Sequence, residues 1–216
     1  MENNVIVRLE NLVVKYDDEL ILKGINLDIH DKEFITLLGP SGCGKTTTLR
    51  IIGGFIEPNE GNVYFDGKKI NGVPPYKRQV NTVFQKYALF QHLNVYENIA
   101  FGLRLKKTPE NEIHKRVMEM LEMVNLKGYG ARRVDYLSGG QQQRVAVARA
   151  LATKPDILFC DEPTGNLDKE SAGLVMEGIL SLKNSGSAIA MITHDNSLLP
   201  YADVVYCLVN GVLCKI

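Results

Sequence analysis

The sequence predicts an α/β fold in which helices cover a parallel sheet and a helical segment is inserted into the sheet layout. Short β-rich apolar runs alternate with helix-compatible stretches at both ends of the chain, which is typical of parallel strands joined by helices. A glycine-rich loop stands directly between one such strand and the helix that follows it. Between residues 94 and 126, the period of the hydrophobic residues changes from that of strands to that of helices.

The first third of the chain is expected to form mostly strands. Its apolar and β-branched residues occur in short runs bounded by polar residues and turn signals. Gly24 interrupts one of these runs, and Asp66 with Gly67 marks a turn after another. A helix is expected from Lys45 onward. The expected strands cover residues 5–9, 13–16, 20–29, 34–38 and 61–66.

The middle of the chain is expected to be helical. Ile113, Val117 and Leu121 recur at intervals that place them on one face of a helix, with charged residues between them. Thr108 and Pro109 indicate a helix start with the proline just inside the N-cap, where its missing N–H has no intrahelical partner to lose. Beyond this segment, helices and strands alternate again. Helices are expected at 141–153 and 171–184, strands at 157–160, 188–193 and 204–209, and a turn at 210–211.

The composition indicates one folded unit without a general attraction for polyanions. The chain has 216 residues, of which 45% are hydrophobic, and this is enough for one substantial core. Lys and Arg together number 25, as do Asp and Glu, so the formal net charge is zero. A balanced charge gives no overall attraction to nucleic acid or to an anionic membrane. We therefore expect no nucleic-acid partner.

The sequence also favours a cytosolic location. The polar and acidic start of the chain lacks the basic and then apolar layout of a signal peptide. No apolar stretch approaches the roughly 18 residues that a membrane-spanning helix requires. Cys43, Cys160, Cys207 and Cys214 have no paired C-x-x-C spacing and are expected to be free, buried thiols in a reducing compartment. Any contact with a membrane is expected to be made through a partner.

Residues 39–46 match the phosphate-binding pattern G-x-x-x-x-G-K-[ST]. The glycines let the backbone curl so that its N–H groups surround phosphate oxygens, and the positive end of the following helix points to the same place. Lys45 can reach the β- and γ-phosphates of a nucleotide, and the Thr46 hydroxyl can bind Mg²⁺. A chance match is expected in at most roughly one chain in a hundred of this size. The residues expected to contact the nucleotide are Gly39, Pro40, Ser41, Gly42, Cys43, Gly44, Lys45, Thr46 and Thr47.

An apolar strand at 157–160 is expected to end in two acidic residues, Asp161 and Glu162. A strand that runs through the core can deliver Asp161 to Mg²⁺ beside the phosphate-binding loop, directly or through water. Glu162, one residue further, can polarise a water molecule for in-line attack on the γ-phosphate. Solvated carboxylates at a strand end would be the ordinary interpretation of this pair alone. The phosphate-binding loop in the same chain favours the metal and base roles.

A further motif resembles the signature of a known family. Residues 137–144 read Leu-Ser-Gly-Gly-Gln-Gln-Gln-Arg, which is similar to the signature of the nucleotide-binding subunits of ABC transporters. A serine and two glycines at a helix start also form an anion site on physical grounds. The resemblance implies a P-loop NTPase core of the RecA-like type, with an N-terminal antiparallel β subdomain and a helical subdomain inserted at about residues 86–150. It also implies that four residues close over the γ-phosphate held by a second subunit: Ser138, Gly139, Gly140 and Gln141.

The resemblance extends to four single positions. Tyr16 stands where the family places an aromatic ring against adenine, although a surface tyrosine on a strand is the simpler interpretation. Gln85 resembles the glutamine that senses Mg²⁺ and the attacking water while linking the sheet core to the helical insert. Asp168 resembles a residue that acts across the dimer, and His194 resembles the switch histidine that contacts the γ-phosphate. The implied catalytic residues are Glu162, His194, Lys45 and Gln85, and the implied metal ligands are Thr46, Gln85 and Asp161.

The family resemblance implies an ATPase that drives transport by ATP-dependent closure of a dimer, with ATP and Mg²⁺ as its ligands. The expected partners are a second ATPase subunit, expected to be a copy of this chain, transmembrane permease subunits and an extracytoplasmic substrate-binding protein. The expected location is peripheral, on the inner face of the cell membrane. Within the family, residues 34–152 are most similar to ATPases of spermidine and putrescine importers. This similarity predicts a polyamine or another small solute as the imported cargo.

Two features of the sequence leave other systems open. Polyamine importers usually carry a regulatory domain after the ATPase core, whereas residues 1–216 are expected to form a single ABC-type ATPase domain without one. Residues 162–168 are also more similar to ATPases of lipoprotein-release and macrolide-export systems. A soluble ABC ATPase, a subunit that binds nucleotide without hydrolysing it, and a nucleotide kinase are further alternatives. The cargo, its direction and the identity of the second subunit stay open at this stage.

Overall fold

The computed structural model describes residues 4–17, 19–85, 87–165 and 167–216. Lys86 and Asn166, which belong to the stretches that carry the family resemblance, lie outside the described residues. In the part of the chain that is described, no helix has the length and apolar character needed to cross a membrane.

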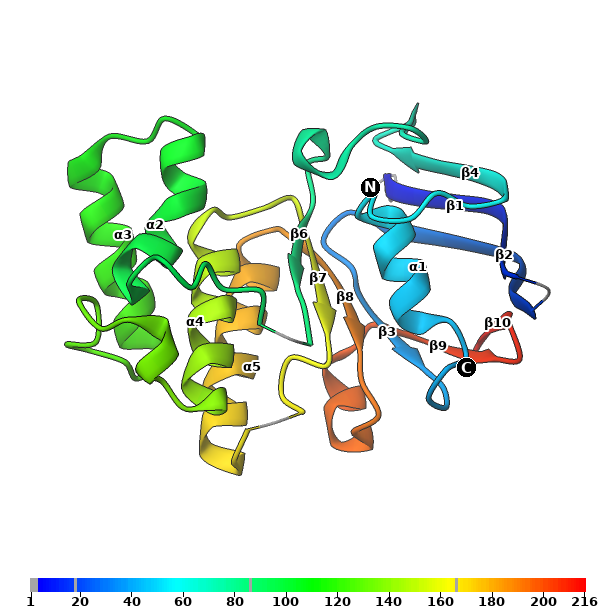
Figure 1. Ribbon diagram of the computed structural model, residues 1–216. Coiled ribbons are helices and arrows are strands. Elements are labelled where there is room, and N and C mark those ends of the chain that lie inside the picture. Colours follow the sequence, from blue (N-terminus) through cyan, green and yellow to red (C-terminus); the bar gives the residue numbers. More distant parts are fainter. Residues whose placement is uncertain (1–3, 18, 86, 166) are drawn as a thin grey trace. The chain divides into compact units, whose positions relative to one another are not determined.

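The chain divides into two compact units, each with its own hydrophobic core. The first unit comprises residues 1–82, 156–161 and 186–216. The second unit comprises residues 83–155 and 162–185. Figure 1 shows that strands dominate the first unit and helices dominate the second. The α/β fold class and the inserted helices expected from the sequence are therefore confirmed.

An antiparallel sheet in the first unit is the expected N-terminal β subdomain. Its strand order is β2-β1-β4-β5, and every pairing in it is antiparallel. Buried residues on β1 and β2 alternate with exposed ones over much of their length, as expected for a sheet with one face on the core. The four strands are β1 (Val5–Tyr16), β2 (Glu19–His30), β4 (Glu60–Phe65) and β5 (Lys68–Lys69).

The expected break between residues 9 and 13 is wrong, because β1 is one continuous strand of 12 residues. Asn11 has a φ of 48°, and the register of β1 against β2 shifts around it. The Asn26 side chain compensates for the irregularity, accepting from the Asn11 N–H at 2.9 Å and donating to Asn11 Oδ1 at 3.2 Å. Such a bulge interrupts the alternation of apolar residues, so that one strand has the sequence pattern of two.

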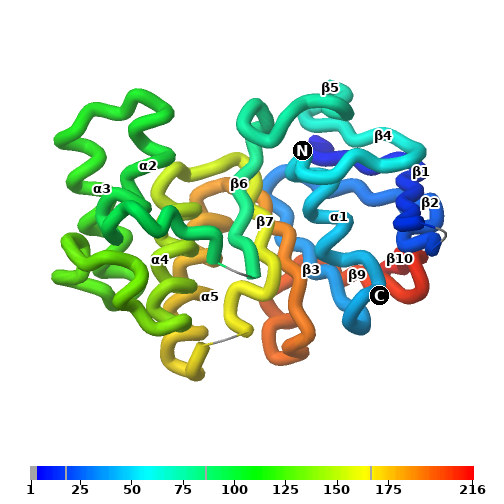
Figure 2. Tube along the Cα trace, in the orientation of Figure 1, coloured from blue at the N-terminus to red at the C-terminus, as the bar shows by residue number. Residues whose placement is uncertain are grey.

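A mostly parallel sheet forms the other layer of the first unit, in the order β10-β9-β3-β8-β7-β6. All residues of β7 and β8 are buried, which explains their apolar runs without alternation. The turn at Asn210 and Gly211 is confirmed, with φ values of 50° and 77°, and the β9–β10 hairpin that it closes is visible in red in Figure 2. The strands are β3 (Phe34–Leu38), β6 (Asn81–Val83), β7 (Ile157–Asp161), β8 (Ala188–Ile192), β9 (Val204–Val209) and β10 (Val212–Lys215).

Helix α1 (Lys45–Ile52) packs into the core that the two sheets share. Leu49, Ile51 and Ile52 are buried there, and burial of one such side chain contributes about 1.5–3 kcal/mol. The Arg78 guanidinium donates to the Ile51 and Ile52 carbonyls at 2.7 and 2.9 Å, which satisfies two carbonyls at the C-terminal end of the helix. Burial lowers the pKa of Arg78. The helix is therefore fixed at the end opposite to the phosphate-binding loop.

The second unit is a bundle in which α4 packs against three other helices. Apolar residues at helical spacing, among them Ile113, Val117 and Leu121, form its core together with residues of the other helices. Helix α5, which follows the acidic residues at the end of β7, belongs to this unit. The helices are α2 (Val95–Leu105), α3 (Glu110–Met123), α4 (Gly139–Ala152) and α5 (Lys169–Asn184), and the short 3₁₀ helices of the chain are Pro75–Lys77, Val134–Tyr136 and Asn196–Tyr201.

The start of α3 differs by one residue from the expected one. Pro109 was expected inside the helix, but it occupies the N-cap with an extended backbone at φ −60° and ψ 142°. Its carbonyl accepts from the N–H groups of Glu112 and Ile113 at 3.0 and 2.9 Å. A proline fits this position because its fixed φ suits the extended N-cap as well as the first helical turn.

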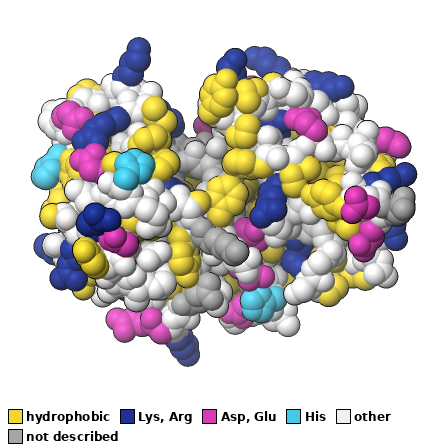
Figure 3. Space-filling model, viewed as in Figure 1, with side chains coloured by type: hydrophobic (Ala, Val, Ile, Leu, Met, Phe, Trp, Pro, Cys, Tyr) yellow, Lys and Arg dark blue, Asp and Glu magenta, His cyan; other side chains and the backbone are white. Residues whose placement is uncertain are grey.

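Charged side chains of both signs are interspersed on the face of the molecule shown in Figure 3. Some charged side chains of the protein form ion pairs: Arg8 with Asp28 at 2.8 Å, and Arg104 with Glu110 at 2.9 Å. Exposed pairs of this kind contribute little to stability, typically about 0–1 kcal/mol. The hydrophobic cores, rather than these pairs, stabilise each unit.

Candidate functional site

The phosphate-binding loop connects the end of β3 to the start of α1, as the sequence predicts. Two of its glycines have positive φ and stand where a side chain would not fit. A Cβ atom at Gly39 would lie 2.2 Å from the Leu208 carbonyl oxygen, and one at Gly44 would lie 2.5 Å from Leu22 Cδ2. Because both contacts are far shorter than any real Cβ contact, the curled backbone requires glycine at these two positions. The loop therefore has the geometry of a cradle for phosphate oxygens.

The Lys45 side chain turns back over this loop. Its Nζ atom donates to the carbonyl oxygens of Gly39 at 2.7 Å and of Pro40 at 2.8 Å, and lies 3.7 Å from Cys43 Sγ. Only 8% of the lysine is exposed. A cation held inside a ring of backbone groups attracts an anion that enters the loop, because charge-assisted hydrogen bonds to phosphate are stronger than those to neutral carbonyls.

Thr46 and Asp161 are brought together from distant parts of the sequence. Thr46 lies in the first turn of α1, and its Oγ1 is 3.2 Å from Asp161 Oδ1 at the end of β7. Asp161 is buried, with 5% of the residue exposed. A hydroxyl and a carboxylate are the hard oxygen ligands that Mg²⁺ prefers. The two residues therefore fit the metal-binding role predicted for them, which stays a prediction.

A hollow of about 350 Å³ lies beside the phosphate-binding loop. Tyr16, predicted to stack on adenine, is exposed at the end of β1 and is paired across the hairpin with Glu19, a lining residue of the hollow. Its ring is thus available to a planar ligand. The lining residues are Glu19, Leu20, Ile21, Lys23, Pro40, Ser41, Gly42, Cys43, Asn210 and Gly211.

The predicted signature lies at the N-terminal end of α4 in the second unit. Ser138 is the N-cap: its side chain accepts from the Gln141 N–H at 3.3 Å, while Gln141 Oε1 accepts from the Ser138 N–H at 3.0 Å. This reciprocal capping box fixes the start of the helix. Gly139 and Gly140 form the first helical positions, and Ser138 and Gly139 are exposed. The positive end of α4 is therefore accessible at the serine, as an anion site requires.

Two other predicted residues meet within the second unit. Gln85 Nε2 donates to Glu162 Oε2 at 3.2 Å, so the proposed sensor and the proposed base are in direct contact. Glu162 has a φ of 52°, in the left-handed region that is rare for residues other than glycine. This backbone conformation follows directly after β7, where the chain leaves the buried sheet.

Asp168 and His194 lie at the ends of regular elements. Asp168 is the N-cap of α5, where its side chain accepts from the Ser171 N–H at 2.9 Å. Hydrogen bonding to Ser171 holds the pKa of Asp168 below its ordinary value. His194 is exposed and follows Thr193, just after β8. The roles predicted for these residues across a dimer and at the γ-phosphate stay predictions.

Sequence reasoning missed two residues of α4 that hold segments of the site. Gln143 contacts the backbone at Glu162, and Arg149 donates to the carbonyls of Ala88 and Tyr87 at 2.8 and 3.4 Å. A signal was present for Gln143, because it precedes the buried residue Val147 by four positions and so lies on the same helix face. The residue type itself gives no signal, because the two residues before Gln143 are also glutamines.

All four cysteines are free, as expected, but the expected burial is wrong for Cys214, which is exposed. Cys160 is fully buried in β7, and burial raises its pKa, so it is an inert core thiol. Cys43 is half-buried in the phosphate-binding loop. Cys207 and Cys214 stand opposite each other in the β9–β10 hairpin. Cys43 is thus the cysteine whose modification would affect the candidate site most directly.

Comparison with known proteins gives a consistent result. A family model described as ABC transporter matches residues 22–165. The chain is 54% identical over 215 residues to the spermidine/putrescine import ATP-binding protein PotA of Acetivibrio thermocellus, covering 99% of this chain and 61% of that protein. It is 51% identical over 221 residues to PotA of Clostridium acetobutylicum, covering 100% of this chain and 62% of the relative. The chain therefore spans about three fifths of the length of these curated relatives.

The chain is also similar to solved structures over nearly its whole length. A structure described as a dimeric, post-hydrolysis state of the ATP-binding cassette MJ0796 bound to ADP and Pi is 34% identical, with a TM-score of 0.89. The match covers 97% of this chain and 98% of that one. A second structure, described as the ATP binding subunit of an ABC transporter, has a TM-score of 0.90 at 24% identity and supports the fold alone.

Proposed function

The chain belongs to the ABC transporter family, and from this premise we propose that it binds and hydrolyses ATP as the motor subunit of a transport system. The observation that carries the proposal is the phosphate-binding loop with the Lys45 ammonium held inside it. The ADP and Pi named for the 34% identical cassette support a nucleotide as the ligand. We further propose that residues 1–216 act as one ABC-type ATPase domain, with residues 86–150 as its helical insert.

In the proposed complex, the curled loop between Gly39 and Gly44 holds the phosphates of ATP through its backbone N–H groups. Lys45 exchanges its contacts with two carbonyl oxygens for contacts with β- and γ-phosphate oxygens. Tyr16 stacks on the adenine ring, beside the hollow that Glu19 lines. The remaining proposed contacts come from Pro40, Ser41, Gly42, Cys43 and Thr47.

Thr46 and Asp161 are the proposed ligands of Mg²⁺, together with Gln85. Oxygen atoms are the ligands that Mg²⁺ prefers, and Thr46 Oγ1 already lies 3.2 Å from Asp161 Oδ1. Mg²⁺, when bound, would neutralise part of the phosphate charge and orient the γ-phosphate. The buried position of Asp161 strengthens its electrostatic effect, because the surrounding core has a low dielectric constant.

Hydrolysis is proposed to use Glu162 as the general base. The carboxylate accepts a proton from water, the water oxygen bonds to the γ-phosphorus, and the bond to the bridging oxygen of ADP breaks. Gln85 orients the carboxylate through the hydrogen bond from its amide. His194 contacts the γ-phosphate and stabilises the charge that develops on it. The products are ADP and inorganic phosphate.

Two copies of the chain are proposed to work as a homodimer. The exposed start of α4, with Ser138, Gly139, Gly140 and Gln141, would close over the γ-phosphate held by the other copy. Asp168 would act across the same interface. The MJ0796 cassette, which is described as dimeric, supports this arrangement. Because hydrolysis removes the shared γ-phosphate, it would release the contact that holds the dimer closed.

The proposed transport system imports a polyamine. The function named for the Acetivibrio thermocellus and Clostridium acetobutylicum relatives, spermidine/putrescine import, supports this cargo. Transmembrane permease subunits and an extracytoplasmic substrate-binding protein are the proposed partners. The chain would then act at the inner face of the membrane, bound to the permease rather than inserted in the bilayer.

Two measurements test the proposal. Phosphate release with ATP and Mg²⁺, measured on the purified chain and on the complex purified with its partners, tests the ATPase activity. Absence of phosphate release from both preparations would refute that activity. Affinity purification of the tagged chain from gently solubilised membranes tests the partners. A multi-span permease together with an extracytoplasmic binding protein is the expected result. A membrane partner with a large external domain would instead favour an exporter, and recovery of no membrane protein would favour a soluble ABC ATPase.

A further inference from the structure

Gln143 is a polar residue in the middle of the buried face of α4. Only 1% of the residue is exposed. Its Nε2 atom donates to the backbone carbonyl of Glu162 at 3.1 Å and to that of Pro163 at 2.5 Å. Its Oε1 atom is buried without a hydrogen-bond partner among the described residues. Leaving a buried amide oxygen unpaired costs free energy, and the two donated bonds are the hydrogen bonds that offset this cost for the Gln143 side chain.

The backbone that accepts these bonds has an unusual conformation. Glu162 has a positive φ of 52° although it carries a side chain, and the proline that follows further restricts the conformations open to it. Such a residue keeps its conformation only when its surroundings impose it. The Glu162 carbonyl also accepts from the Gly165 N–H at 3.3 Å, so that Gln143 and a tight turn hold the same oxygen.

Glu162 is therefore held at two points within the second unit. Gln143 holds its backbone, and Gln85 contacts its carboxylate at 3.2 Å. The direction of the Cα–Cβ bond depends on the backbone angles, so a change in φ at this residue would turn the carboxylate away. The amide of Gln143 bonds to main-chain oxygens, and its effect on the carboxylate therefore passes through the main chain.

We propose that Gln143 is a positioning residue for ATP hydrolysis. It fixes the left-handed backbone of Glu162 and thereby aims the carboxylate that removes the proton from water. This inference rests on the proposed function, in which Glu162 is the general base. The role belongs to Gln143 and not to the neighbouring glutamines, because Gln141 closes the helix cap and Gln142 donates to the Leu137 carbonyl at 3.1 Å.

The kinetic test compares Gln143→Met with Val147→Ala. Methionine keeps the length of the side chain but removes both donated bonds, whereas Val147→Ala removes buried packing one turn further along α4. We expect Gln143→Met to lower kcat at least about tenfold while the KM for ATP changes less than about twofold, because misplacement of a base by a fraction of an ångström slows chemistry without weakening substrate binding. A kcat for Gln143→Met within about twofold of that for Val147→Ala would overturn the proposal.

A second variant, Gln143→Asn, tests the proposal independently if Gln143→Met does not fold. Gln143→Asn retains a buried amide but withdraws it by one methylene group, so that the donated bonds to Glu162 and Pro163 are lost with little change in polarity. It is expected to lower kcat to a similar extent, again with the KM for ATP preserved. Wild-type turnover in this variant would contradict the positioning role.

Hydrogen–deuterium exchange tests the contact without any catalytic readout. The Gly165 amide donates to the Glu162 carbonyl, and its exchange reports on the turn that Gln143 supports. We expect faster exchange in a peptide covering residues 162–168 for Gln143→Met, and unchanged exchange there for Val147→Ala. Unchanged exchange in both variants would overturn the contact. If the wild-type chain hydrolyses no ATP while exchange responds as expected, the proposed function fails and the backbone contact stands.

Discussion

Thr46 Oγ1 lies 3.2 Å from Asp161 Oδ1, although 115 positions separate the two residues in the sequence. The parallel sheet produces this contact. In it β3, which leads into the phosphate-binding loop, and β7, which ends at Asp161, are separated only by β8. Parallel strands end at the same edge of a sheet, so the loop after one and the carboxylate at the end of the other meet there.

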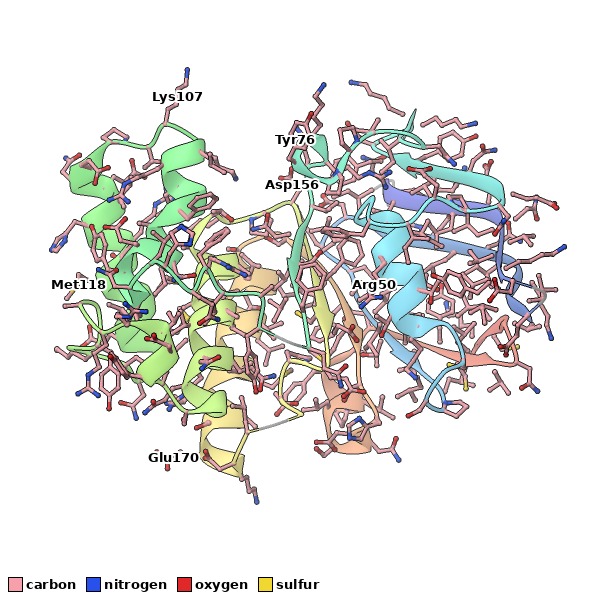
Figure 4. All side chains as sticks on the ribbon, in the orientation of Figure 1. Arg50, Tyr76, Lys107, Met118, Asp156 and Glu170 are labelled. Atoms are coloured by element: carbon pink, nitrogen blue, oxygen red, sulfur yellow. The ribbon has the colours of Figure 1, made fainter. Side chains whose placement is uncertain are left out.

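The first prediction concerns the metal. Asp161→Asn is expected to raise the Mg²⁺ concentration needed for half-maximal ATP hydrolysis by roughly tenfold or more, because a neutral amide is a weaker ligand for a hard cation. A Mg²⁺ titration of phosphate release measures it. Asp156→Asn is the matched control: Asp156 is exposed and precedes the other end of β7, as labelled in Figure 4. An equal Mg²⁺ requirement in the two variants would contradict the metal role of Asp161.

The second prediction concerns the lysine inside the loop. Lys45→Ala removes the cation that contacts the Gly39 and Pro40 carbonyls. It is expected to weaken ATP binding and to lower turnover at least about a hundredfold, because the positive charge proposed to bind the β- and γ-phosphates is lost. Binding of a fluorescent ATP analogue and phosphate release measure the two effects. Lys115→Ala, on the exposed side of α3, controls for the loss of one positive charge, and wild-type turnover in Lys45→Ala would refute the phosphate-binding role.

Much of the fold was predictable because it depends on local patterns. Hydrophobic period and turn chemistry predict several elements of the fold: the strands β7, β8 and β9, the start of α1, and the turn at Asn210 and Gly211. The continuous strand β1 was not predictable, since the bulge at Asn11 depends on the Asn26 side chain of the neighbouring strand. A local pattern contains no information about that partner.

The site was predictable as a set of residues, but its contacts were not. The distance between Thr46 and Asp161 depends on strand order, and the bond from Gln85 to Glu162 depends on how the chain leaves β7. Gln143 has the same side chain as the two residues before it, and only the packing of α4 makes it the buried one. Helical spacing could have indicated its burial, but not its two backbone acceptors.

The third prediction concerns the proposed base and the dimer. Glu162→Gln is expected to leave ATP binding intact and to lower hydrolysis at least about a hundredfold, because the amide cannot accept a proton from water. The unhydrolysed ATP would then hold two copies together, which size-exclusion chromatography with ATP and Mg²⁺ would detect. Glu170→Gln, at the first turn of α5 in Figure 4, is the control. A Glu162→Gln variant that stays monomeric with ATP would contradict the dimer model.

The fourth prediction concerns Cys43. Its sulfur lies 3.7 Å from Lys45 Nζ in the half-buried loop, so a bulky thiol reagent there would block the phosphates. Thiol-reactive reagents are expected to inhibit ATP hydrolysis, and bound ATP is expected to protect. Cys43→Ser should resist inhibition, whereas Cys214→Ser, which removes the exposed thiol, should not. Inhibition that persists in Cys43→Ser would assign the effect to another cysteine.

The fifth prediction concerns Asp168 as the N-cap of α5. Hydrogen bonds from Ser171 hold its pKa below the ordinary value of 3.8. A carboxyl group with a depressed pKa in the folded state contributes stability that is fully present above pH 3.8 and is lost as the pH falls through the folded pKa. Asp168→Asn keeps a capping oxygen but does not titrate, whereas Asp168→Ala removes the cap and should lower the Tm at neutral pH by about 2–4 °C.

The pH dependence separates the charge of Asp168 from its capping geometry. Thermal unfolding of the wild-type chain and of Asp168→Asn, followed from about pH 7 to about pH 2, is expected to show a constant difference in Tm down to about pH 4. Below that pH the difference should shrink, because protonation removes the charge-assisted part of the bond to the Ser171 N–H while the variant is unaffected. A difference that stays constant over the whole range would show that the cap acts through geometry alone, without a contribution from the charge.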